Sequence, residues 1–169
     1  MSLLTAPTRR DPKGLSAVLT DVAKGDAVSA LFRSDRYGVY RIFGHTYASV
    51  AYDGFLLAGA PLGVPGRLSG DLVRLDRLGD DPWDIPQGSP MPLGTVAHGD
   101  LVAARFDAHP YGEFVAVGHA IGLGTSSLVV GGWLVASAGE SGVRLIDMTY
   151  LPQTLAGAPC PPRAAVEGG

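Results

Sequence analysis

The chain contains a single cysteine, Cys160, which lies in a proline-rich stretch near the C-terminus. One cysteine excludes an intrachain disulfide and any metal cluster that needs several thiolates. The sequence also has no run of about 18 apolar residues, and residues 1–13 lack the apolar core of a signal peptide. We therefore expect a cytoplasmic protein without a membrane-spanning segment.

Helix-favouring residues and positive charge are scarce as well. Two lysines, three glutamates and two glutamines stand against 24 glycines and 13 prolines, so the composition favours an all-β fold. The net charge is −3 and the isoelectric point is near 5.7, which leaves no excess of positive charge to neutralise phosphates. A protein partner or a homo-oligomer is favoured over nucleic acid, and no small-molecule ligand is identified.

An internal repeat is the most informative feature that is present. Shifted by 74 positions, Leu19–His45 aligns with Leu93–His119, and 12 of the 27 pairs are identical. Further along, the matching offset changes to 78 at Gly54–Ala58 and to 70 at Val73–Leu75. This pattern predicts an internal duplication whose copies differ in the length of their loops.

Each copy is expected to form four strands. In the first strands, Ala27–Arg33 and Leu101–Asp107, apolar residues recur at every second position, which is typical of a half-buried strand. A longer second strand follows in each copy. The third and fourth strands are expected at Phe55–Ala60, Leu72–Leu78, Trp133–Ala138 and Val143–Tyr150.

Turn residues precede the first strand of each copy. Asp26 and Asp100 each follow a glycine, and an aspartate in this position commonly bonds the backbone of its own turn. His98, in the second of these turns, is expected to be exposed. One helix is expected, at Gly14–Ala23, where apolar residues share a face.

These patterns predict an all-β protein of two tandem small β-barrels, packed with pseudo-twofold symmetry. The architecture resembles small barrels of the SH3-like type, with OB-like and split-barrel arrangements as alternatives. The expected organisation is an N-terminal extension (1–14), repeat 1 (15–78), an acidic proline-rich linker (79–90), repeat 2 (91–151) and a flexible tail (152–169).

Histidines are the first candidates for chemistry. His45 and His119 occupy equivalent positions, each after a glycine, and a twofold axis between the copies would place both near the junction. Together with Asp107 and His109, which lie two residues apart, they are candidate ligands of a divalent metal. The structural alternative is a strand bulge with a hydrogen-bonded imidazole at each Gly-His pair, and a capped turn at Asp107.

Four aromatic residues indicate a candidate ligand groove. Tyr37 and Tyr111 precede the second strand of each copy, while Phe55 and Trp133 open the third. Aromatic side chains line the grooves of SH3-like peptide binders, although core packing would explain the same residues. Cys160 is expected to lack a fixed partner that would lower its pKa.

No catalytic triad, carboxylate pair or phosphate-binding loop has a convincing spacing in the sequence. The sequence therefore predicts a non-catalytic binding or scaffolding module and no cofactor. The alternative is a small metalloprotein or hydrolase-type enzyme that uses the histidines at the junction of the repeats with a divalent metal. A third interpretation is an oligomer that buries the apolar outer faces of the second strands.

Overall fold

The structure, a computed structural model, describes residues 3–4, 22–49, 54–57, 60–61, 71–78, 85, 88–90, 95–108, 112–123, 127–131, 133–134 and 143–163. Within these ranges every regular element is a β-strand except one 3-10 turn, which confirms the predicted all-β class. The elements are β1 (Ala27–Ser34), β2 (Gly38–Ser49), β3 (Gly54–Leu57), β4 (Ala60–Pro61), β5 (Asp71–Arg77), β6 (Ser89–Pro90), β7 (Leu101–Ala108), β8 (Gly112–His119), β9 (Ile121–Leu123), β10 (Ser127–Val130), β11 (Trp133–Leu134), β12 (Val143–Tyr150) and the 3-10 turn η2 (Gln153–Leu155).

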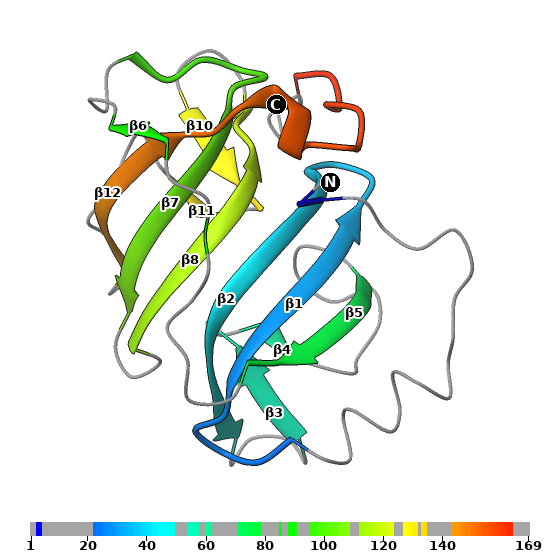
Figure 1. The fold of residues 1–169 in the computed structure, drawn as a ribbon, viewed down its shortest axis with the longest axis vertical. Coiled ribbons are helices and arrows are strands. Elements are labelled where there is room, and N and C mark those ends of the chain that lie inside the picture. The colour runs from blue at the N-terminus through cyan, green and yellow to red at the C-terminus, as the bar shows by residue number, and fades with distance from the viewer. Residues whose placement is uncertain are drawn as a thin grey trace.

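Most of the strands form one continuous antiparallel sheet. In the first half of the chain (residues 22–78), β1 lies between β5 and β2, and in the second half (residues 95–151), β7 lies between β12 and β8. β2 and β8 then pair with each other and join the halves (Figure 1). β9, β10 and β11 form a small separate sheet.

The expected pair of closed barrels is not found. Among the described strands β5 pairs only with β1, and β6 pairs only with β12, so the two ends of the sheet do not meet. The physical reason lies at the junction. β2 and β8 satisfy each other's backbone N–H and C=O groups, and each half thereby covers an edge of the other.

The first two strands of each half pair in the same register. Ala27 of β1 faces His45 of β2, and Leu101 of β7 faces His119 of β8. Leu101 and His119 lie 74 positions after Ala27 and His45. β5 has a bulge opposite Leu31 and Phe32 of β1, and β12 has a bulge opposite the equivalent residues of β7, Arg105 and Phe106. The two halves thus correspond in these three strands and in the position of the bulge.

The bulges correct the predicted alignment of the fourth strands. Phe32 faces Leu72, and its counterpart Phe106 faces Leu145, so the structural offset between these strands is 73. The sequence match of Val73–Leu75 at an offset of 70 is therefore wrong by three residues. A short apolar pattern can be aligned at several offsets. The pairing with the neighbouring strand determines which alignment is correct.

A tight turn leads into the first strand of each half. Asp26 and Asp100 each accept a hydrogen bond from the backbone N–H three residues earlier, at 2.8 Å in both halves. Gly25 and Gly99 precede them with φ of +90° and +97°, in the left-handed region that favours glycine. The predicted role of the two aspartates is confirmed.

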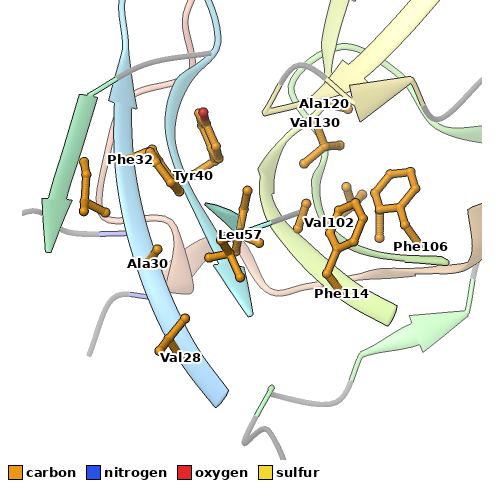
Figure 2. Packing of buried hydrophobic residues seen from close by; sticks show 14 of the residues in the cluster. Val28, Ala30, Phe32, Tyr40, Leu57, Val102, Phe106, Phe114, Ala120 and Val130 are labelled. Atoms are coloured by element: carbon orange, nitrogen blue, oxygen red, sulfur yellow. The ribbon is translucent and has the colours of Figure 1, made fainter. Parts of the chain in front are cut away.

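One apolar cluster spans both halves on one face of the sheet. Phe32 stacks on Tyr40 with ring centroids 5.3 Å apart, and Phe106 stacks on Phe114 at 5.1 Å. Leu57 of β3 belongs to the same cluster, which therefore forms one shared core rather than one core for each half (Figure 2). The strand residues in it alternate as predicted: Val28, Ala30, Phe32, Tyr40, Ile42, Val102, Ala104, Phe106, Phe114 and Ala116.

Glycines permit the close pairing of β2 with β8. Gly118 faces Tyr40, and a Cβ added to Gly118 would lie 2.9 Å from the Cβ of Tyr40. The counterpart is Gly44, whose added Cβ would lie 3.2 Å from the Cβ of Phe114. The β1–β2 and β7–β8 registers run unbroken through both glycines, so the interpretation of the Gly-His pairs as bulges is wrong. Each glycine instead makes room for an aromatic residue of the other half.

A second apolar cluster lies on the opposite face of the sheet. The two chain ends cover it, and the backbone N–H of Leu3 bonds the carbonyl of Leu155 in the tail (Figure 1). The expectation that one half covers this face of the other is wrong, because the halves meet edge to edge. An oligomer is not needed to bury it. The cluster consists of Leu4, Phe43, Leu101, Ala103, Val115, Val117, Leu151 and Ala156.

Parts of the predicted linker and of the predicted tail contact the sheet. Ser89–Pro90, expected in the linker, form β6 and pair with Thr149 and Tyr150 of β12. The tail, expected to be flexible, packs on the second cluster through Leu155, Ala156 and Ala158. Residues 14–21 of the expected helix lie outside the described residues. No helix in the described part of the chain is long and apolar enough to cross a membrane.

Candidate functional site

The structure separates the two histidines of the predicted metal site. Gly118 faces Tyr40 across antiparallel strands, so His119 lies one residue to one side of this pair and His45 lies five residues to the other. At about 3.3 Å per residue, the separation along the sheet is about 20 Å. His45 is exposed and His119 is buried, and they are too far apart to bind one ion.

Of the remaining predicted metal ligands, Asp107 and His109, the structure describes Asp107 alone. Asp107 is exposed and forms an ion pair with Arg144, with an N···O distance of 3.5 Å. His109 lies outside the described residues. In the part of the chain that the structure describes, no three His, Cys, Asp or Glu side chains come together where they could hold a metal ion.

Of the four aromatic residues predicted to line a groove, the structure describes the side chain of one. Tyr37 is half-buried and packs against the shared core, with the guanidinium of Arg36 5.9 Å from its ring centroid. Tyr111 and the side chains of Phe55 and Trp133 lie outside the described residues. The groove formed by all four aromatics stays a prediction.

A different groove lies between the β1–β2 turn and the C-terminal tail. It has a volume of about 650 Å³. Arg33 and Asp35, on the wall formed by the turn, are exposed and carry opposite charges. The wall formed by the tail contains three prolines and the thiol of Cys160. The site therefore combines a charged wall from the first half with a largely apolar wall from the chain end.

The tail contacts the β1–β2 turn at Gly38. A Cβ added to Gly38 would lie 2.9 Å from the Cδ of Pro161, and the φ of Gly38 is +77°. Its counterpart Gly112 has nearly the same φ, +78°, but no described atom lies within 4 Å of an added Cβ. The Pro161 contact thus distinguishes the first turn from the second.

Cys160 also contacts a histidine of the second half. Its Sγ lies 3.8 Å from the Nε2 atom of His98. The Nδ1 atom of His98 accepts a hydrogen bond from the backbone N–H of Gly122 at 3.0 Å, so the proton of the neutral ring is on Nε2. That atom therefore points an N–H at the sulfur and cannot accept the thiol proton.

Partial burial raises the pKa of the Cys160 thiol. A nucleophilic cysteine needs the opposite shift, which a protonated neighbour or a helix N-terminus supplies. The thiol pKa is raised, and the Nδ1 atom of His98 is already engaged as an acceptor, so His98 does not activate Cys160. The arrangement suits a docking contact rather than acid–base chemistry.

His119 is enclosed at the end of β8 by the same tail. Only 4% of its surface is exposed, and its Nδ1 atom has no hydrogen-bond partner among the described residues. Burial lowers the pKa of His119, His98 lowers this pKa further, and a side-chain hydrogen bond with Gln153 of the tail raises it in part. Gln153 also donates to the carbonyl of Gly99 at 3.4 Å. The tail therefore covers a neutral imidazole.

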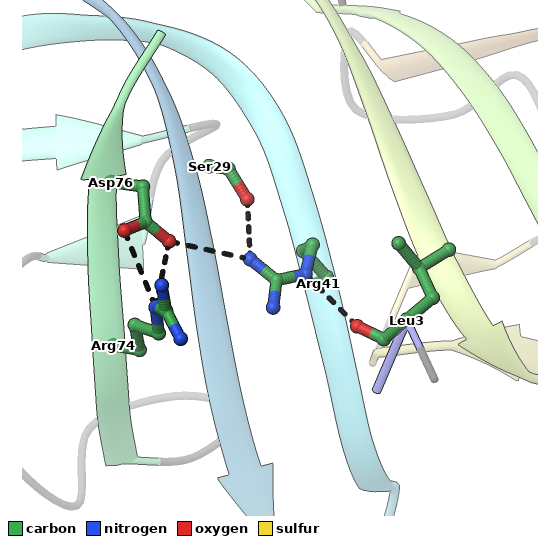
Figure 3. Close-up of polar contacts among 5 residues, drawn as sticks. All are labelled: Leu3, Ser29, Arg41, Arg74 and Asp76. Carbon is green, nitrogen blue, oxygen red and sulfur yellow. Dashed lines mark hydrogen bonds and ion pairs between the residues drawn. The ribbon is translucent and has the colours of Figure 1, made fainter. Parts of the chain in front are cut away.

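In the first half, the same face of the sheet carries a polar network (Figure 3). Arg41 donates from Nη1 to Ser29 Oγ at 2.6 Å and from Nε to the carbonyl of Leu3 at 3.1 Å. Asp76 lies 3.8 Å from Nη1 and also pairs with Arg74. Burial lowers the pKa of Arg41, and Asp76 partly offsets this effect. The network anchors the N-terminal residues to the sheet.

Sequence patterns did not indicate the contact between His98 and Cys160, which are 62 positions apart. His98 is half-buried instead of exposed. Cys160 has His98 as a neighbour, but its pKa is raised, so the expectation that no partner lowers this pKa is confirmed. The only signal available in the sequence is that Lys24 occupies the position equivalent to His98. Two otherwise similar turns differ at that residue.

The groove, the thiol–imidazole contact and the enclosed His119 all involve the C-terminal tail, which lies at the same end of the sheet as the N-terminus (Figure 1). This end is the candidate functional site. Comparisons of the chain with models of protein families, with curated proteins and with solved structures found no match.

Proposed function

We propose that this protein is a non-catalytic binding module that holds an extended segment of a protein partner in the groove. The groove between the β1–β2 turn and the tail carries the proposal. Its volume of about 650 Å³ falls within the range of ligand pockets. Both of its walls are narrow chain segments, which favours an elongated ligand.

The chemistry of the walls favours a peptide. Arg33 and Asp35 offer opposite charges along one side. Pro159, Pro161 and Pro162 offer apolar rings without backbone N–H groups along the other. A peptide with an apolar side chain between charged ones would match both walls. The net charge of −3 disfavours nucleic acid as the partner.

The state of the single cysteine supports a non-catalytic role. The raised pKa of Cys160 and the N–H that His98 points at it both oppose formation of a nucleophilic thiolate with His98 as its base. A free, exposed thiol is also typical of proteins in reducing compartments. A cytoplasmic location is therefore part of the proposal.

An internal duplication with pseudo-twofold symmetry is also part of the proposal. Ile42 faces Ala116 across the junction, and these residues are separated by 74 positions, the offset of the repeat. A twofold axis through this pair would exchange the β1–β2 hairpin with the β7–β8 hairpin. It would bring the turn of the first hairpin beside the start of the second copy.

Selection of a random peptide library against the whole chain near pH 7.5 tests the binding function. We expect selected peptides to slow alkylation of Cys160, the only thiol, because it lines the groove. Arg33→Glu is expected to weaken peptide binding about fivefold, the effect of one exposed charge. Asp107→Arg reverses the charge at the counterpart position in the second half, and it should leave the affinity unchanged.

Two outcomes contradict this function. One is a library that yields no peptide, and the other is a set of peptides that bind without protecting Cys160. Light scattering on the same sample gives the mass in solution. A dimer in which Cys160 is protected without any peptide would assign the groove to a second copy of the chain and overturn the peptide proposal.

A further inference from the structure

Two histidines lie beneath the C-terminal tail, His119 at the end of β8 and His98 in the turn before β7. The tail reaches His119 through the side chain of Gln153 and reaches His98 through Cys160. Tail residues 157–162 also form one wall of the groove. The contacts that dock the tail therefore also determine the shape of the groove.

His119 cannot take up a proton in this position without loss of stability. With 4% of its surface exposed and no acceptor for Nδ1 in the described part of the chain, an added N–H would be buried and unpaired. A buried N–H and an unsolvated charge are both unfavourable. The favourable response is for the cover over the ring to move away.

The charged groups around His119 do not compensate. Arg41 of β2 lies opposite Val117 of β8. His119 lies two residues after Val117, so Arg41 and His119 point to the same face of the sheet. On the tail, the guanidinium of Arg163 lies against Gly122. The acidic residue of the nearby turn, Asp100, already accepts the N–H of Ala97. An imidazolium at His119 would thus have two arginines on the elements packed around it.

His98 is the titratable neighbour of His119, and its charge lowers the pKa of His119 further. Its Nδ1 atom already accepts the N–H of Gly122 at 3.0 Å. His98 therefore does not offset the cost of a proton on His119.

We propose that the tail is an acid-released latch, which docks while His119 is neutral and leaves the sheet when His119 takes up a proton, so that one wall of the groove opens. Release of the tail does not depend on any ligand. Only its role as a regulator of peptide binding rests on the function proposed above.

The direction of the effect follows from His119. Docking of the tail holds the pKa of His119 below its ordinary value of 6.5, so docking is fully favoured above pH 6.5 and is progressively lost as the pH falls below it. When the tail leaves, the burial that lowers the pKa of His119 is relieved, and this pKa rises toward its ordinary value. Between pH 7.5 and pH 5.0, His119 alone can raise the ratio of released to docked tail by at most about 30-fold.

Hydrogen exchange of the full chain at pH 7.5 and pH 5.0, corrected for intrinsic exchange rates, tests the latch. We expect protection of residues 151–163 to fall about tenfold at pH 5.0 while the β7–β8 amides stay protected. His119→Gln, which cannot ionise, should remove most of this fall. His45→Gln is the matched control, because His45 is exposed at the counterpart position, and it should leave the fall unchanged.

An NMR titration of the histidine rings in the unaltered protein keeps the test decisive if His119→Gln does not fold. We expect His119 to become protonated over the same pH range in which the tail loses protection. Protonation without release, or a fall that persists in His119→Gln, overturns the latch. Peptide binding is measured separately at pH 7.5, so a latch without peptide binding contradicts only the function, and binding without a latch contradicts only this proposal.

Discussion

Arg41 and its counterpart Val115 occupy equivalent positions in β2 and β8 but meet different surroundings. Val115 is 2% exposed and packs in the second apolar cluster. Arg41 is enclosed by Ser29, Asp76 and the carbonyl of Leu3. This half-buried guanidinium needs its partners, because a lost partner leaves a charged donor or an acceptor unpaired. One face of the sheet is thus stabilised by hydrogen bonds in one half and by apolar packing in the other.

Arg41→Val is expected to lower the free energy of unfolding by about 2 kcal/mol, because Ser29 and the carbonyl of Leu3 lose their donor. Adding Ser29→Ala should recover about half of this loss, since Ala103 is the counterpart of Ser29 and both partners are then apolar. Urea denaturation measures both changes. Arg74→Ala is the control, since its side chain is 56% exposed, and it should change stability by less than about 0.5 kcal/mol. A double variant no more stable than Arg41→Val would contradict this account.

At the scale of elements, the docked tail and the β1–β2 turn offer a matched test. Gly38→Ala and Gly112→Ala both place a Cβ at a positive φ, and each is expected to lower the free energy of unfolding by about 1 kcal/mol. Only Gly38→Ala also brings a Cβ against Pro161. We expect hydrogen exchange at pH 7.5 to show about fivefold weaker protection of residues 151–163 in Gly38→Ala alone. Equal protection in the two variants would show that the contact with Pro161 does not hold the tail.

Those parts of the fold that depend on a few neighbouring residues could be predicted from the sequence. The alternation of Val28, Ala30 and Phe32 identified the face of β1 that lies in the shared core, and the Gly-Asp pairs identified both turns. The predicted half-buried strand is wrong, because Ser29 and Leu31 on the other face are buried as well. Both signals act over two to four residues. They require no knowledge of the partner strand.

Pairing of β2 with β8 could not be predicted in the same way. Strand edges pair through backbone N–H and C=O groups, which nearly every residue carries. The amino-acid composition of a strand therefore does not show which other strand its edge will pair with. Gly44 and Gly118 were noticed as a repeat, but the aromatic residues that cover them belong to the other half. Their role becomes visible only once the halves are joined.

The candidate site was predictable only in part for a related reason. His119 was identified from the repeat, but its neighbour Gln153 belongs to a segment with no periodic pattern. The contact of His98 with Cys160 joins two loops that are distant in sequence. Contacts of this kind follow from the final packing of the chain ends. They leave no local pattern to detect.

At the scale of the whole molecule, the shared core predicts one cooperative unfolding transition. Phe32 and Phe106 are 2% and 1% exposed and lie in opposite halves of the same cluster. Phe32→Ala and Phe106→Ala are each expected to lower the free energy of unfolding by about 3 to 4 kcal/mol and to shift the same single transition. Calorimetry should give equal calorimetric and van't Hoff enthalpies. Two transitions, each sensitive to one substitution, would instead show two independent domains.

The junction of β2 with β8 also bears on the history of the protein. An aromatic residue of each strand covers a glycine of the other, so the contact is self-complementary. Under the internal duplication proposed above, an ancestral chain with a single copy would have formed a homodimer through this edge. Fusion of two copies would have made the contact intramolecular and independent of concentration. The proposed duplication would also have freed the two copies to diverge, one acquiring the tail and its histidines and the other a half-buried arginine.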